Sequence, residues 1–441
     1  YVVNANFNSQ LALGQSSVNS IATAATNGFI NPRSIHSNGT HYVVADSSNG
    51  RVLIYNGDPR SNVPSIVLGA SSLTSVGLYN NGSISASNLS YPIDAIFIGS
   101  KLAVSDYYNH RVLIWNSIPT VNNQAADVVL GQPDFTSYTV NNGGRSCSSL
   151  YGPRGLGSDG TRLLVADYLN NRVLLWNTIP TVNNTAADVV IGESSCSAAL
   201  TGSTAVLLKT PLHASIEGNQ VFVSDYGNNR VLIYNSIPTT HGASADIVLG
   251  QSNFTAATAN QGVAVSAATL KSPYRALAWG GKLYISDSGN ARVLVYSPIP
   301  TSNNTAATIA LGQANLTTAT LAATQVGMGV PEGIWLDAGG FYSVDNAYHR
   351  IKHYPLPLST GLSADALIGQ PSYVYSVSNV KSTLTTSATD LFQPLNSIIV
   401  GTKLIVPDVG NNRVLIWNTL PTVNNQSPDV VIGQPDMTSM T

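Results

Sequence analysis

The sequence predicts an all-β protein, a seven-bladed β-propeller built from four-stranded antiparallel blades. Three observations support this. A unit of about 60 residues recurs seven times, each unit holds four short β segments, and the third segment is a continuous apolar run after its leading Arg. A strand without polar alternation is buried on both faces, which requires a sheet above it and another below. Sheets repeated around an axis meet that requirement.

Three residues anchor each unit: a Pro, an Asp 14 positions later, and an Arg 5 positions after the Asp. Successive Asp residues are 58 to 63 positions apart, so the frame is rigid. The anchor prolines are Pro32, Pro92, Pro153, Pro211, Pro273, Pro331 and Pro394. The Asp and Arg partners are Asp46 with Arg51, Asp106 with Arg111, Asp167 with Arg172, Asp225 with Arg230, Asp287 with Arg292, Asp345 with Arg350, and Asp408 with Arg413.

The frame divides the chain into an N-terminal segment, 1–30, and a propeller, 31–441. The expected units are 31–70, 91–132, 152–193, 210–251, 272–313, 330–370 and 393–434. In the second unit, the β-branched runs predict strands over Asp94–Ile98, Lys101–Ser105, Arg111–Trp115 and Asp127–Leu130.

A hydrophobic residue lies three positions before every anchor Pro, and we expect it to plug the space beneath the crossover between blades. These residues are Phe29, Leu89, Leu150, Leu208, Leu270, Met328 and Leu391.

The four residues between each Asp and Arg predict a tight turn with a structural role. The carboxylate can accept turn N–H groups, and the Arg can pair with it. Six of the seven copies place Asn third, and Tyr348 takes that position in the sixth. Asn tolerates the left-handed conformation, so we expect the third position to adopt it. Because every copy carries the acid, a catalytic role for any one of them is disfavoured.

The turn pattern, with Asp106–Val112 as the closest copy, resembles the NHL-repeat family of β-propellers. The string that follows, from Ile-Pro-Thr to Gly-Gln-Pro, is similar to secreted bacterial NHL-repeat proteins. The resemblance covers nearly the whole chain and implies the fold, while members of the family range from enzymes to scaffolds. The chain departs from the family pattern in two ways. Its unit is longer than common propeller repeats, and it has seven units whereas many members have six blades.

Composition narrows the classes of function. The chain has 20 Lys+Arg and 22 Asp+Glu, a formal charge of −2, and only 10% charged residues. It therefore lacks the basic excess that a nucleic-acid partner requires. No apolar run approaches the roughly 18 residues of a membrane-spanning helix, so no membrane insertion is expected. The chain begins at Tyr1 without a leader, and we interpret it as a processed segment. Its Ser/Thr/Asn-rich character predicts a secreted or cell-surface location.

Positions that vary within the constant frame are candidates for ligand binding. The first and second residues after each Pro are expected to open onto the mouth of the central channel. The candidates are Arg33, Ser34, Asp94, Arg154, His213, Tyr274, Arg275, Glu332 and Asn396. Such a mixed ring is suited to a small polar or anionic ligand. A water-filled channel without a ligand is the alternative.

No cofactor is predicted, and zinc or calcium at the channel is the alternative. The best-known enzymes of the NHL family, peptidyl-hydroxyglycine amidating lyases, hold zinc with histidines, and such a site needs about three protein ligands. The histidines weighed for it are His110, His213 and His349. A propeller lactonase would need a calcium site of inward-facing oxygens, here at most Glu332, Asp94 and Asn396.

Two further features stand outside the frame. Cys147 and Cys196 fall in successive crossovers, where they form either a disulfide or two free thiols. The segment Gln10–Gln15, with Leu11, Ala12 and Leu13 at its centre, is an eighth copy of the fourth strand. It either adds a fifth strand to the closing blade, remains from a longer array, or completes a blade of the next molecule and builds a filament.

The leading hypothesis is a non-enzymatic extracellular module for binding or assembly, with a protein, copies of itself or a glycan as partner. A low net charge opposes self-association only weakly. The alternative is a metal-dependent lyase or hydrolase of the NHL-propeller type acting at the channel mouth.

Overall fold

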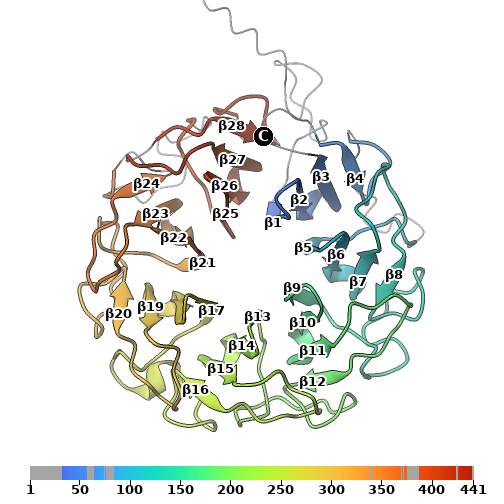
Figure 1. Ribbon diagram of the computed structural model, residues 1–441, viewed down its shortest axis with the longest axis horizontal. Coiled ribbons are helices and arrows are strands. Elements are labelled where there is room, and N and C mark those ends of the chain that lie inside the picture. The colour runs from blue at the N-terminus through green and yellow to red at the C-terminus, as the bar shows by residue number, and fades with distance from the viewer. Residues whose placement is uncertain are drawn as a thin grey trace, which may run out of the picture.

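The computed structural model describes residues 32–56, 64–73, 75, 84–337, 340–368, 370, 372–374, 387–423 and 426–439. Within these residues, 28 strands form seven four-stranded antiparallel sheets arranged as a ring around a central axis (Figure 1). In each sheet the strands are hydrogen-bonded in sequence order, from the innermost to the outermost. The predicted fold class is confirmed.

The strands of the first four blades follow the repeat. They are β1 Pro32–Ser37, β2 His41–Asp46, β3 Arg51–Asn56, β4 Ile66–Leu68, β5 Pro92–Ile98, β6 Lys101–Asp106, β7 Arg111–Trp115, β8 Val128–Leu130, β9 Pro153–Ser158, β10 Leu163–Asp167, β11 Arg172–Trp176, β12 Val189–Ile191, β13 His213–Glu217, β14 Gln220–Asp225, β15 Arg230–Tyr234 and β16 Ile247–Leu249.

The last three blades repeat the same order. They comprise β17 Pro273–Trp279, β18 Lys282–Asp287, β19 Arg292–Tyr296, β20 Ile309–Leu311, β21 Pro331–Asp337, β22 Gly340–Asp345, β23 Arg350–Tyr354, β24 Ala366–Ile368, β25 Ile398–Val400, β26 Lys403–Asp408, β27 Arg413–Trp417 and β28 Val430–Ile432. Short 3₁₀ turns join the second and third strands: η1 Ser47–Asn49, η2 Tyr107–Asn109, η3 Tyr168–Asn170, η4 Tyr226–Asn228, η6 Ser288–Asn290, η7 Asn346–Tyr348 and η8 Val409–Asn411. A further turn, η5 Ala259–Gly262, lies in a crossover.

The innermost strand of the second blade begins earlier than predicted. β5 starts at Pro92 because this residue pairs with Asp106, with a shift of register between Pro92 and Asp94. Pro lacks the N–H that a regular ladder needs, so the irregularity at the start of the strand accommodates it.

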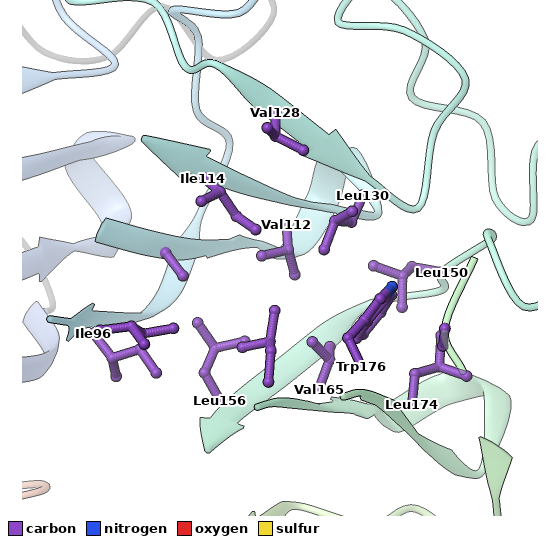
Figure 2. Close-up of a cluster of buried hydrophobic side chains, with 14 of the residues drawn as sticks. Ile96, Val112, Ile114, Val128, Leu130, Leu150, Leu156, Val165, Leu174 and Trp176 are labelled. Atoms are coloured by element: carbon purple, nitrogen blue, oxygen red, sulfur yellow. The ribbon is translucent and has the colours of Figure 1, made fainter. Parts of the chain in front are cut away.

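The hydrophobic core lies between the blades. In each cluster, side chains from one sheet interdigitate with those of the next, as Figure 2 shows for Val112 and Ile114 of β7 against Val165 of β10 and Trp176 of β11. All five residues of β7 are buried, which confirms the two-sided burial predicted for third strands. The hydrophobic residue three positions before Pro is fully buried in every described copy: Leu89, Leu150, Leu208, Leu270, Met328 and Leu391. Phe29 lies outside the described residues.

The ring closes through side-chain packing between the first and last blades. Ile35 and Val44 of the first blade share a core with Ile405 and Val414 of the last. Each of these two blades consists of four consecutive strands of its own, so neither borrows a strand from the other terminus among the described residues. The predicted extra strand at 10–15 lies outside those residues. In the described part of the chain, no helix is long and apolar enough to cross a membrane.

Candidate binding site at the axial channel

The Asp–Arg turn holds each blade in its frame. In the second blade, Arg111 Nε lies 2.8 Å from Asp106 Oδ2, and both side chains are fully buried. Asn109 Nδ2 donates to the same oxygen over 2.8 Å. The other carboxylate oxygen accepts the N–H of Ser90, which belongs to the preceding crossover, over 2.6 Å. Equivalent Asp–Arg pairs at 2.7 or 2.8 Å occur in all seven blades.

The same Arg ties together the crossovers on both sides of its blade. Arg111 Nη1 donates to Phe135 O over 2.8 Å, while Nη2 donates to Ser85 O and Asn88 O over 3.1 and 2.7 Å. A buried guanidinium is tolerated only when its donors are satisfied, and these carbonyls satisfy them. The turn residues are therefore structural.

The prediction that the third turn residue is left-handed is wrong. That residue ends the 3₁₀ turn, and the fourth residue adopts the left-handed conformation, with φ between 52° and 61°. The third-position Asn instead uses its amide to hold the Asp carboxylate, a role that needs its side chain and not its backbone freedom. The left-handed residues are Gly50, His110, Asn171, Asn229, Ala291, His349 and Asn412.

All nine predicted channel residues lie at the axis. The mouth, on the face with the Asp–Arg turns, is lined by the residues that directly follow the anchor Pro, including Arg33, Arg154, Tyr274 and Glu332. A deeper cavity adds the second residues after Pro, namely Asp94, His213, Arg275 and Asn396. The cavity beyond it includes Ser34 and His36. Because these cavities share lining residues, they form one channel.

Aromatic rings, and not carboxylates, support the two arginines of the mouth. Arg33 Nη2 donates to the hydroxyl of Tyr91 over 3.1 Å, and its guanidinium lies 5.8 Å from the centre of that ring. The guanidinium of Arg154 lies 4.5 Å from the ring centre of Tyr168 and 5.9 Å from that of Tyr107. Cation–π contacts hold a guanidinium in place without neutralising its charge.

A third arginine lies deeper in the channel. Arg275 Nη1 donates to Asn396 Oδ1 over 3.4 Å. Among the described residues, the buried Nε atoms of Arg33, Arg154 and Arg275 have no hydrogen-bond partner. None of the three forms an ion pair within that part of the chain. Three guanidinium groups therefore converge on one channel with unused donors.

The carboxylate of Asp94 is occupied by backbone groups. Its Oδ2 accepts the N–H of Leu156 on the next blade, and its Oδ1 accepts its own neighbour Ala95, both over 3.0 Å. Burial raises the pKa of Asp94, while these bonds and the charge of Arg275 oppose that rise. Asp94 thus clips the second blade to the third, and it is poorly placed to serve as a calcium ligand.

Burial shifts the titration of the other channel residues. It raises the pKa of Glu332 to about 7, against the opposing charges of Arg33 and Arg154. Burial, assisted by the charge of Arg275, lowers the pKa of His213 to about 3, and the same two causes lower the pKa of His36 to about 4. Both histidines are therefore neutral at pH 7, and the size of the positive charge at the mouth depends on whether Glu332 is ionised.

The histidines weighed for zinc have different surroundings. His110 and His349 accept the N–H of Gly152 and Gln393 at Nδ1, over 3.2 and 2.9 Å, and so clip their turns to the next blade. His213 alone lines the channel. Among the described residues, the one group of three His, Cys, Asp or Glu donors within 4.8 Å of one another is Cys147, Cys196 and His241, away from the axis.

Cys147 and Cys196 are joined in a disulfide, with their Cα atoms 4.8 Å apart. The bond connects the crossover that enters the third blade to the crossover that leaves it. The sequence leaves this pairing open, because spacing alone does not set the distance between two crossovers.

A contact between neighbouring blades that recurs around the ring was not predicted from the sequence. Asn183 Oδ1 accepts the N–H of Val129 over 3.1 Å, while the N–H of Asn184 donates to Val129 O over 2.7 Å. This two-bond clamp fastens the connection between third and fourth strands to the outer strand of the preceding blade. The recurring Asn pair was its signal, but its partner lies in another unit.

Fold and channel together define the class of this protein: a seven-bladed β-propeller with a charged axial channel. No protein-family model and no curated protein matches the chain. Hydrazine synthase from Kuenenia stuttgartiensis is structurally similar, with a TM-score of 0.52 and 12% identity over 89% of this chain and 96% of that one. At this identity the likeness concerns the fold alone.

Two other solved structures have lower scores. The WD40 β-propeller domain of Doa1 has a TM-score of 0.44 and 12% identity over 81% of this chain and 88% of that one. The computationally designed Ika8 protein has a TM-score of 0.49 and 7% identity over 95% of this chain and 90% of that one.

Proposed function

We propose that the protein is a secreted or cell-surface propeller of the NHL type that works as a non-enzymatic binding module, and that its channel mouth holds an anionic group. The observation that carries this proposal is the convergence of Arg33, Arg154 and Arg275 with unused donors. An anion at this point would satisfy the donors and offset the charges. A guanidinium presents paired N–H groups that match carboxylate and phosphate oxygens.

The titration of the channel residues favours binding over acid–base catalysis. A general acid or base works best with a pKa near the working pH, and burial moves His213 far below it. Burial raises the pKa of Glu332 to about 7, but this residue lines the mouth together with Arg33 and Arg154. There its effect is to adjust the charge that an incoming anion meets.

Titration calorimetry with inorganic phosphate and with a small dicarboxylate tests this proposal. We expect binding by the wild type, and at least a tenfold loss of affinity in the double variant Arg33→Met, Arg154→Met, which removes two charge-assisted contacts. Arg162→Met is the matched control, because Arg162 forms an exposed pair with Asp159 and takes no part in the channel. Equal affinity in the wild type and the mouth variant, or no binding at all, would reject the proposal.

Location and assembly belong to the same proposal. The disulfide and the low charge fit an oxidising, extracellular environment.

We further propose that the segment around Leu11, Ala12 and Leu13, for which the sequence predicts a strand, joins copies of the chain, which the small net charge of −2 scarcely opposes. Sedimentation of the full chain and of a variant lacking residues 1–15 decides this point. Self-association that depends on the segment supports it, and a monomer in both cases contradicts it.

A metal-dependent lyase or hydrolase acting at the channel is the second candidate, since the imidazole of His213, which can ligate a metal ion, lines it. Elemental analysis of the purified protein separates the two. One equivalent of zinc or calcium that is lost when His213 is replaced by Ala would favour the enzyme. Metal-free protein that still binds phosphate would favour the binding module.

A further inference from the structure

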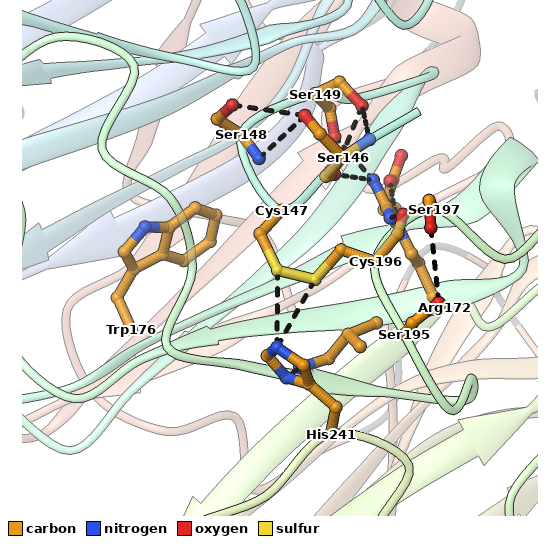
Figure 3. The surroundings of a disulfide bond; sticks show 12 residues. Ser146, Cys147, Ser148, Ser149, Arg172, Trp176, Ser195, Cys196, Ser197 and His241 are labelled. Atoms are coloured by element: carbon orange, nitrogen blue, oxygen red, sulfur yellow. Dashed lines mark hydrogen bonds and ion pairs between the residues drawn. A yellow bond between two sulfur atoms is a disulfide. The ribbon is translucent and has the colours of Figure 1, made fainter. Parts of the chain in front are cut away.

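The disulfide lies in a microenvironment that the other blades do not share. Cys196 is nearly buried, at 8% exposure, whereas Cys147 is partly exposed. His241, from the connection between β15 and β16, points its Nε2 at both sulfur atoms (Figure 3). The distances from Nε2 are 3.8 Å to Cys147 Sγ and 3.9 Å to Cys196 Sγ.

All three residues depart from the repeat frame at one place. The carbonyl of Cys147 accepts the N–H of Ala187, and at other blade junctions the carbonyls of Ala86, Ala205 and Ala267 accept the equivalent N–H. The carbonyl of Cys196 accepts the bond from the turn Arg that large apolar residues accept elsewhere: Leu73, Phe135, Phe254, Leu316, Tyr373 and Met437. Cys147 therefore takes a position that Ala occupies at other blade junctions, and Cys196 takes one that a large apolar residue occupies in the other blades.

His241 occupies the position of the clamp Asn. Its Nδ1 accepts the N–H of Val190 over 3.2 Å, as Asn122, Asn183 and Asn303 accept from Val67, Val129 and Val248. The N–H of Gly242 donates to Val190 O over 3.0 Å and completes the clamp. Because Nδ1 is an acceptor, the proton of the neutral ring is on Nε2. The ring therefore presents an N–H to the sulfur atoms and no lone pair to a metal ion.

We infer that the Cys147–Cys196 disulfide is a thiol-exchange site, at which an external thiolate attaches to Cys147 while His241 stabilises the departing Cys196. In the reaction, the sulfur of the incoming thiolate bonds to Cys147 Sγ. The bond between the two protein sulfurs breaks, and its electron pair leaves on Cys196 Sγ as a thiolate. The Nε2–H of His241 donates a hydrogen bond to that thiolate. Exchange rates rise as the leaving thiolate becomes more stable.

The two sulfur atoms have unequal roles. Attack requires access, which the partly exposed Cys147 provides. Cys196 packs in the core cluster that contains Trp176, so it is shielded from the attacking thiol but remains in reach of His241. The product is a mixed disulfide at the protein surface, with a small thiol or with the cysteine of a peptide.

The test uses the full oxidised chain with reduced glutathione and, in a second arm, with a short peptide bearing one cysteine. Samples are quenched with N-ethylmaleimide over time, and peptide masses locate both labels. We expect the thiol on Cys147 and maleimide on Cys196, and the faster arm identifies the preferred kind of thiol. Thiol attached to Cys196 instead, or no adduct in either arm, would overturn the assignment.

His241→Asn isolates the part played by the ring, because Asn is the residue of the clamp in other blades. We expect exchange about tenfold slower, the value of one hydrogen bond to a developing charge, with an unchanged unfolding temperature. The double variant Cys147→Ala, Cys196→Leu restores the residue types of the frame and serves as the folded control without adduct. An unchanged rate in His241→Asn, or stoichiometric zinc bound through His241 by the reduced protein, contradicts the role given to the ring.

Discussion

The turn between the second and third strands of each blade contains a buried ion pair of one Asp and one Arg. The Asp and Arg of each turn are buried, as is the third-position Asn in the six turns that have one, and together they connect one blade to the crossovers before and after it. Desolvation makes such a pair a weak source of net stability, but breaking it leaves an uncompensated charge. The turn trio therefore fixes the geometry of the blade.

Asp225→Asn tests the turn at the fourth blade. The substitution leaves Arg230 buried without its counter-charge, so we expect the free energy of unfolding to fall by about 3–5 kcal/mol. Asp159→Asn, at an exposed pair with Arg162, should cost no more than about 1 kcal/mol. Urea denaturation measures both. Equal losses in the two variants would show that burial of the turn pair is not what matters.

Seven left-handed residues follow the 3₁₀ turns between the second and third strands. Ala291 is the one among them that is neither a glycine nor a residue with a hydrogen-bond acceptor in its side chain. Its φ is 55°, whereas Asn229 in the same position uses Oδ1 to accept the N–H of Ser272 over 2.9 Å. We expect Ala291→Asn to raise the free energy of unfolding by about 1 kcal/mol, since Asn adopts this conformation at lower cost. Asn229→Ala, the reverse change, should lower it. Thermal unfolding of the pair checks the prediction, which fails if both variants shift in the same direction.

Glu332 sets how anion binding depends on pH. Its pKa of about 7 means that the carboxyl is largely neutral at pH 6 and ionised at pH 8. Ionisation places a negative charge beside Arg33 and Arg154, so the affinity for phosphate should fall as the pH rises, by up to about tenfold after correction for the ionisation of phosphate itself. Glu332→Gln should bind with little dependence on pH. Calorimetry at both pH values checks this, and an equal dependence in both proteins would contradict it.

Among the elements, the sixth blade departs most from the others. Its third strand, β23, carries Lys352 at the position where the six other blades have a buried Leu. Lys352 is fully buried, and its Nζ donates to Val326 O and Gly327 O over 2.9 and 3.0 Å. Burial lowers the pKa of Lys352 well below its ordinary value.

Lys352→Leu should therefore stabilise the protein by about 1–4 kcal/mol at pH 7, because a buried charge is replaced by the residue of the frame. The unfolded chain keeps this proton up to about pH 10.4, whereas the folded chain releases it earlier. As the pH rises toward about 10.4, the free energy of unfolding of the wild type should therefore increase relative to that of the variant. The stabilisation that Lys352→Leu provides should shrink accordingly. Denaturation at pH 7 and pH 10 measures it. A destabilised variant would show that the two carbonyl bonds outweigh the cost of desolvation.

How far the elements could be predicted depends on whether their cause is local. β6 and β7 match the predicted ranges to within a residue, since β-branched runs and a repeated turn are visible in the chain itself. The left-handed position was misplaced by one residue, because an Asn that bonds a carboxylate and an Asn that only turns look alike in sequence. The clamp between Asn183 and Val129 joins two units, so no single unit reveals it.

For the whole molecule, the repeat predicted which residues reach the axis but not what they do there. All nine predicted positions line the channel, as a ring of identical frames requires. That the Asp94 carboxylate accepts the N–H of Leu156, and that Tyr107 supports Arg154, follow only from the contacts between blades. The small number of charged residues in the chain can be related to this arrangement. Every blade uses one Asp and one Arg in a buried turn, so the channel arginines, which form no ion pair among the described residues, stand out against a nearly neutral background.

The most direct test of an anion site at the mouth is the anomalous diffraction of crystals soaked in selenate, a heavy analogue of sulfate and phosphate. We expect an anomalous peak within hydrogen-bonding distance of the guanidinium groups of Arg33 and Arg154, and its absence from the Arg33→Met, Arg154→Met variant. Selenate bound elsewhere on the protein with an empty channel mouth would contradict it.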